Sequence, residues 1–145
     1  MSTPLSVAAP APSSQPRFLE VDDRVPAPLR KLLDEADGCL DMSFTTGGTA
    51  CARQAIRTIV QMEHADAPDY ATSLLTLSEK HPAVAPALFQ ILAMLGTGDE
   101  PLTPDALRAL IAAVKAIVYE IYVLGAERVE RLMYVHQLVE ALKQK

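Results

Sequence analysis

Residues 103–142 read TPDALRALIAAVKAIVYEIYVLGAERVERLMYVHQLVEAL, and no other segment constrains the fold as strongly. Thr103 followed by Pro104 indicates a helix start, because the hydroxyl can cap the first turn and proline is tolerated at the first helical position. Apolar residues then recur every three or four positions from Leu107 to Leu142, the pattern of one amphipathic helix. A helix of about forty residues is about 60 Å long, roughly twice the width of a small domain.

The second half of this helix is expected to project beyond the rest of the fold. Gly125 lies on the apolar stripe, and we expect one continuous or slightly bent helix through it. Residues 125–145 then need an apolar surface elsewhere, and a second copy of the chain is the simplest partner. The residues expected at this interface are Val129, Leu132, Val135, Val139 and Leu142.

Four shorter segments with helical periodicity precede it, at about 28–42, 45–64, 70–80 and 83–95. Half of the chain is apolar, yet only seven residues are Phe or Tyr and none is Trp. A core of Ala, Leu, Val and Ile suits closely packed helices. Gly47 and Gly48 then indicate close approach of the first two helices, and an anion held at the helix N-terminus is the alternative explanation. The prediction is an all-α bundle of about five helices over residues 29–124.

The N-terminal residues are expected to lie outside this bundle. Residues 1–16 hold four prolines and no charge, which predicts a disordered Pro/Ala/Ser arm. Residues 17–28 form an extended lead-in whose Phe18, Leu19 and Val21 can dock on the core. There is no secretory signal and no long apolar run, so we expect no membrane contact, a cytoplasmic location and reduced Cys39 and Cys51.

Charge and spacing argue against several functional classes. The net charge is −5 and no basic stripe is present, so nucleic-acid binding is not expected. Glu63, His64 and Asp66 form a single local cluster, which is too few ligands for a metal site. No Ser-His-Asp or Cys-His pairing stands out. The sequence therefore predicts no catalysis, no metal and no cofactor.

The segment MLGTGDEPL, residues 94–102, is the remaining candidate for a binding loop. It lacks the glycine spacing and the Lys-Ser/Thr pair of a phosphate-binding loop. Gly96 is interpreted as a residue that ends one helix, just past its last turn. An anion held by Gly96, Thr97 and Gly98 is the alternative. Arg53 is a second candidate, since a charge among apolar residues needs a carboxylate or backbone carbonyls.

The stretch EADGCLDMSFTTGGTACARQAI, residues 35–56, resembles the opening of a bacterial domain family of unknown function in the HEPN-like clan. The matching pairs are Glu35-Ala36 and Cys39-Leu40, followed by Arg53-Gln54-Ala55-Ile56. LLTLSEK and ILAMLG resemble later helices of that family, and the similarity covers residues 26–124. It implies a helical bundle, a form that also occurs appended to restriction endonuclease subunits.

Some members of the family that this chain resembles have a ribonuclease site, and this chain lacks the motif of that site at the expected position. Active HEPN ribonucleases carry an Arg-x(4–6)-His motif near the glycine turn, but residues 96–101 contain no His. The expected function is therefore a non-catalytic interaction module, a homodimer or a partner subunit. Two alternatives stay open. One is an RNA-cleaving or RNA-binding protein that uses Arg53 with His64 or Arg131 with His136. The other is a binder of small anions at the 94–102 loop.

Overall fold

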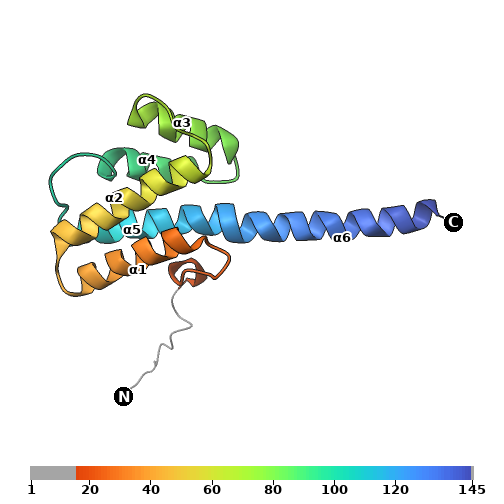
Figure 1. The fold of residues 1–145 in the computed structure, drawn as a ribbon, viewed down its shortest axis with the longest axis horizontal. Helices are drawn as coiled ribbons and strands as arrows, with labels where there is room; N and C mark the ends of the chain where they lie inside the picture. The colour runs from red at the N-terminus through yellow and green to blue at the C-terminus, as the bar shows by residue number, and fades with distance from the viewer. Residues whose placement is uncertain (1–15, 145) are drawn as a thin grey trace, which may run out of the picture.

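The computed structural model describes residues 16–144, and within that range the chain is all-helical, as predicted (Figure 1). The expected arm at 1–16 lies outside the described residues except for Pro16. The elements are α1 (Ala27–Asp41), α2 (Thr45–Met62), α3 (Tyr70–Lys80), α4 (Pro86–Leu95), α5 (Pro104–Val118), a π-helical turn (Tyr119–Leu124) and α6 (Gly125–Lys143).

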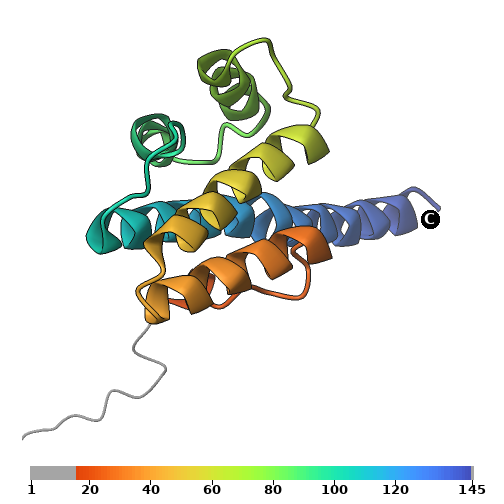
Figure 2. The same cartoon turned by 60° about the vertical axis from the view of Figure 1, so that its left-hand side comes forward.

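Helix α5 is the centre of the bundle. It contacts α1, α2 and α4, while α3 packs on α4 and α2 at the periphery (Figure 2). Its core-facing residues are fully or almost fully buried: Leu107, Leu110, Ile111, Val114, Ile117 and Val118. The predicted start is confirmed, because the Thr103 hydroxyl accepts a hydrogen bond from the amide of Ala106 at 3.2 Å.

Helices α1 and α2 pack closely because α2 begins with two glycines. A Cβ atom on Gly48 would lie 2.7 Å from Leu107 Cδ2 and 3.3 Å from Cys39 Cβ, and one on Gly47 would lie 3.2 Å from Cys39 Sγ. Both cysteines are free and partly buried. Burial is the main cause that raises the pKa of the Cys51 thiol. This fits the packing interpretation of the glycines.

The lead-in is folded rather than extended. It forms a 3-10 turn at Arg17–Leu19 and further turns before α1, and its buried side chain is that of Val25. Phe18, Leu19 and Val21 are only half-buried. The 6%-exposed Lys115 in α5 fixes this segment, since its ammonium donates to the carbonyl oxygen of Leu19 at 3.0 Å and to Asp37 Oδ2 at 2.6 Å.

Residues Pro104–Lys143 form one continuous helix through Gly125, which has ordinary helical dihedrals. The helix is not regular, because a π-helical turn occupies Tyr119–Leu124. After Val118, the next buried residue is Val123, five positions later, whereas Ile121 and Leu124 are only half-buried. The apolar stripe expected from Leu107 onward therefore continues only in part: Ile121 packs against the core while half-buried, and the extra residue of the π turn brings Val123 into the core.

One 18-residue window of this long helix is apolar enough to cross a membrane by length and composition alone, although charged residues interrupt it. In this structure 44% of that window is buried inside the bundle. A core helix of a soluble protein passes the same test, and the window does not by itself indicate a membrane protein.

Two boundaries differ from the predictions. Helix α4 begins at Pro86 rather than at residue 83, because proline occupies its first turn. Gly96 is the C-cap of α4 with φ −83°, not a left-handed residue beyond it. Glycine is required there for space: a Cβ would lie 2.1 Å from the Tyr70 hydroxyl and 2.5 Å from the carbonyl oxygen of Leu92.

Candidate functional site

The most exposed apolar region of the described chain is α6. None of its residues is buried, and it extends away from the bundle (Figure 1). The five residues predicted from sequence are exposed as follows: Val129 56%, Leu132 70%, Val135 53%, Val139 42% and Leu142 72%. Met133, Tyr134 and Leu138 are also more than half exposed. We call these eight residues the α6 surface.

The charges of α6 balance within the helix. Its acidic residues are Glu127, Glu130 and Glu140, and its basic residues are Arg128, Arg131 and Lys143. The chain as a whole carries −5, so two copies repel each other weakly in general. The eight side chains of the α6 surface carry no charge, so they add nothing to this repulsion when a second copy approaches.

A pocket of about 270 Å³ lies at the base of α6. It is formed where the α3–α4 connection meets the π turn and the first turn of α6. Its lining residues are Lys80, His81, Pro82, Ala83, Val84, Glu120, Ile121, Gly125 and Arg128. We call it the root pocket. At its rim, Arg128 pairs with Glu120 at 2.8 Å.

Beside the root pocket, three residues from distant parts of the sequence form a hydrogen-bonded network. Tyr122 donates its hydroxyl proton to Glu63 Oε2 at 2.7 Å, and His81 Nε2 lies 2.7 Å from Glu63 Oε1. Burial, with the Glu63 hydrogen bond, raises the pKa of Tyr122. The network ties the end of α2 and the α3–α4 connection to the π turn.

The sequence did not reveal this network. It grouped Glu63 with His64 and Asp66, but the Glu63 carboxylate points to His81 and Tyr122 instead. His64 follows the end of α2 with φ +55°, in the left-handed region. Within residues 16–144 no three His, Cys, Asp or Glu side chains gather as a metal site would need.

Arg53 makes the backbone contacts that its position predicted. It is 8% exposed and reaches the loop between α4 and α5. Its Nε and Nη2 donate to the carbonyl oxygen of Leu95 at 3.3 and 3.2 Å, and its Nη1 donates to those of Gly98 and Glu100 at 3.0 and 2.9 Å. Four of its five N–H groups are used in this way, which leaves one for any ligand.

The loop itself offers little to an anion. Gly98 has φ +110°, and Arg53 holds its carbonyl group. The pocket beside it, about 300 Å³, is lined by Arg53 and Arg57 as well as by Asp99, whose carboxylate offsets part of the positive charge that an anion would meet there. The hydroxyl of Thr49 accepts the amide hydrogen of Leu102 at 3.0 Å. Gly96, Thr97 and Gly98 thus belong to a connection that Arg53 and Thr49 of α2 hold by hydrogen bonds.

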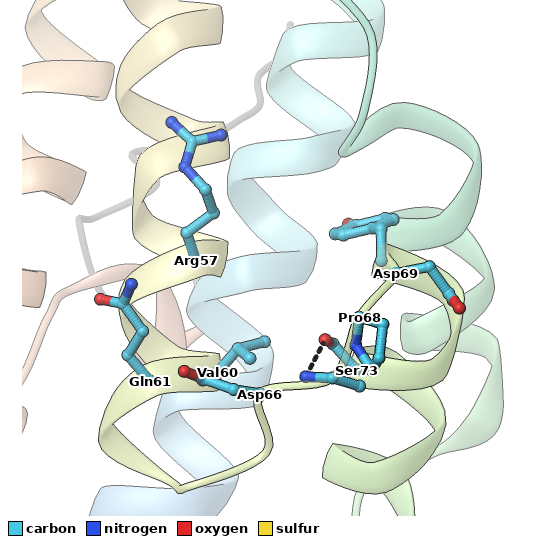
Figure 3. Close-up of a pocket in the computed structure, with 9 residues that line it drawn as sticks. Arg57, Val60, Gln61, Asp66, Pro68, Asp69 and Ser73 are labelled. Atoms are coloured by element: carbon cyan, nitrogen blue, oxygen red, sulfur yellow. Dashed lines mark hydrogen bonds between the residues drawn. The ribbon is translucent and has the colours of Figure 1, made fainter.

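A further pocket of about 290 Å³ lies between the C-terminal half of α2 and the start of α3 (Figure 3). Ser73 Oγ accepts the amide hydrogen of Ala67 at 3.0 Å and so fixes the connection that closes it. The Tyr70 hydroxyl donates to the carbonyl oxygen of Leu92 at 2.8 Å, and burial raises its pKa to about 12. Asp69 lies across the pocket from Arg57, whereas Asp66 lies next to Val60 below Arg57, and the pocket gathers no nucleophile with a base.

The two Arg/His pairs of the RNA-cleaving alternative differ in exposure. Arg53 of the first pair is buried, whereas His64 is exposed just after the end of α2. Arg131 and His136 are both exposed on α6, and five residues on a helix place their side chains about 140° apart. Arg53 is held by the loop, as described above.

Comparison with known proteins adds no relative: no protein-family model, no curated protein and no solved structure matches this chain. The resemblance to HEPN-like bundles therefore stays a prediction from the residues quoted above.

Proposed function

We propose that this chain is a non-catalytic association module that forms a homodimer through α6. The observation that carries the proposal is a 19-residue helix with no buried residue and eight large apolar side chains 42–72% exposed. An apolar surface of this extent on a protein in water is typical of a binding surface. The proposal includes a HEPN-like bundle without the ribonuclease motif and a cytoplasmic location.

A second copy is the partner that the α6 surface favours. The helix is neutral, so it meets an identical helix without net charge repulsion. Heptad spacing relates Leu132, Val135, Val139 and Leu142, which is the seam that paired helices bury. The apolar residues also spread beyond that seam to Val129 and Leu138, so more than one face can be covered.

The test is the absolute mass in solution, measured by light scattering on a sizing column. The full chain has a mass of 15.7 kDa, and the proposal predicts a dimer of twice this mass. Leu132→Asp or Val139→Asp is expected to give a monomer with unchanged helical content, because both side chains are exposed to solvent. Met94→Asp is the matched control, since Met94 is 74% exposed on α4 and is expected to leave the dimer intact.

A full chain that elutes as a monomer would refute the homodimer. A dimer that survives both aspartate variants would place the interface outside α6. Growth inhibition on expression, lost when His64 or His136 becomes Ala, would instead favour the RNA-cleaving alternative.

A further inference from the structure

We propose that the root pocket is the receptor for the C-terminal end of α6 from a second copy, so that two chains pair with their α6 helices antiparallel. This inference rests on the proposed homodimer and adds its geometry. The specific claim is that the partner's Leu142 enters the root pocket against Gly125, and the reverse contact follows from the two-fold symmetry.

The seam of α6 leads directly into the root pocket. Leu132, Val135, Val139 and Leu142 occupy alternating a and d positions of two heptads. The same spacing continued toward the bundle reaches Arg128 and Gly125, and both of these residues line the root pocket. A helix that packs along the seam therefore arrives at the pocket.

Antiparallel pairing in one register aligns the seam with the pocket. In antiparallel pairs the a residues of one helix face the d residues of the other. If Leu132 faces the partner's Val135, then Val139 faces the partner's Arg128, and Leu142 faces the partner's Gly125. Gly125 has no side chain, and a Cβ there would lie no closer than 3.5 Å to any atom outside its neighbours. The largest apolar side chain at the helix end thus meets the smallest residue.

The chemistry of the root pocket matches the end of α6. Pro82, Ala83, Val84 and Ile121 give it apolar walls, and its volume of about 270 Å³ exceeds what a leucine side chain needs. In the same register the partner's Glu140 lies level with Arg128. The partner's Lys143 lies within reach of Glu120, one turn further toward the bundle. Arg128 and Glu120 thereby each face an opposite charge, and Lys80 is a further charged residue of the lining.

The size of the contact also favours a register that includes the bundle. A 19-residue helix is about 28 Å long and about 10 Å wide, so one face of it offers only a narrow strip. Stable interfaces bury about 800 Å² of accessible surface on each partner. Two root pockets, one at each end of the helix pair, extend the contact beyond the α6 strip.

Two other pairings leave the root pocket empty and predict different neighbours. A parallel pair places Leu142 beside the partner's Leu142. A shorter antiparallel pair, shifted by one heptad, places Leu142 beside the partner's Leu132. Disulfide formation distinguishes the three, because it requires Cα atoms within about 4.4–6.8 Å.

The experiment uses full-length chains in a Cys39→Ala, Cys51→Ala background, carrying Gly125→Cys, Leu142→Cys or Leu132→Cys. Two variants are mixed under reducing conditions so that their subunits exchange, and the mixture is then oxidised. Covalent dimers are separated by electrophoresis without reductant, and circular dichroism checks that each variant is folded. We expect a covalent heterodimer from Gly125→Cys mixed with Leu142→Cys, and none from either variant alone. Linkage of Leu142→Cys with itself, or with Leu132→Cys only, would overturn the inference, as would a dimer in which no pair links. Each of these outcomes keeps the homodimer, whereas a monomer by light scattering refutes the homodimer itself.

Discussion

Replacing Arg53 with methionine tests whether this buried charge is structural. The guanidinium makes four hydrogen bonds to three carbonyl groups of the α4–α5 loop. A hydrogen bond to a charged group contributes about 1.5–3 kcal/mol, but the carbonyls of Gly98 and Glu100 lie in exposed residues and regain water. Only the carbonyl oxygen of the half-buried Leu95 loses hydrogen bonds, those from Arg53, that water replaces poorly. We therefore expect Arg53→Met to lower the free energy of unfolding by about 2–3 kcal/mol rather than by the sum of four bonds.

Urea unfolding followed by circular dichroism measures this loss. Arg57→Met is the matched control, because Arg57 lies on the same helix with an exposed side chain that bonds only to Gln54. Its effect should stay within about 0.5 kcal/mol. Arg53→Lys should fall between the two, since one ammonium group cannot reach all three carbonyls. Hydrogen exchange of the amides at 96–102 should accelerate in Arg53→Met.

Two results would refute the structural account of Arg53. The first is an Arg53→Met variant no less stable than Arg57→Met. The second is a rise in the melting temperature of the wild-type chain with inorganic phosphate that Arg53→Met abolishes. That result would restore the anion-binding alternative for the loop.

Three further predictions concern other parts of the bundle. Gly96→Ala should lower the free energy of unfolding by about 3 kcal/mol, because the new Cβ would overlap backbone atoms. Gly38→Ala should raise the free energy of unfolding by about 0.5–1 kcal/mol, because no atom lies within 4 Å of the new Cβ. Equal effects of the two variants in urea unfolding would refute the steric account. Asp37→Asn should cost about 2 kcal/mol, since it leaves a buried ammonium without its counter-ion, and Lys115→Met should cost about 1, since it leaves a carboxylate that water reaches. The reverse order in urea unfolding would contradict this. Burial raises the pKa of Tyr70 from 10 to about 12, so the folded state keeps a proton that the unfolded chain releases, and stability should fall as the pH rises from 10 to 12. Tyr70→Phe should make that fall shallower in thermal unfolding, and an unchanged slope would argue against it.

Local signals predicted the helices well because their causes lie within a few residues. Thr103 caps α5, and α3 spans the predicted Tyr70–Lys80. For contacts between distant segments, the sequence predicted only the chemical kind of partner and not which residue supplies it. The sequence indicated that Arg53 needs carbonyls or a carboxylate, but not that residues more than forty positions away supply them. The Glu63 network escaped prediction for the same reason, since its three members meet only after the helices pack.

The π turn shows why a continuous pattern in sequence need not mark one continuous face. From Leu107 to Leu142 the apolar spacing runs without a break, so the long helix reads as a single stripe. One extra residue at Tyr119–Leu124 turns everything after it by about 100°. The first half of the stripe then faces the core, while Gly125 and Arg128 line the root pocket instead. The apolar face of α5 is therefore buried in the bundle, whereas α6 runs past the α3–α4 connection. Its apolar residues lack a partner because of this change of direction as well as because of helix length.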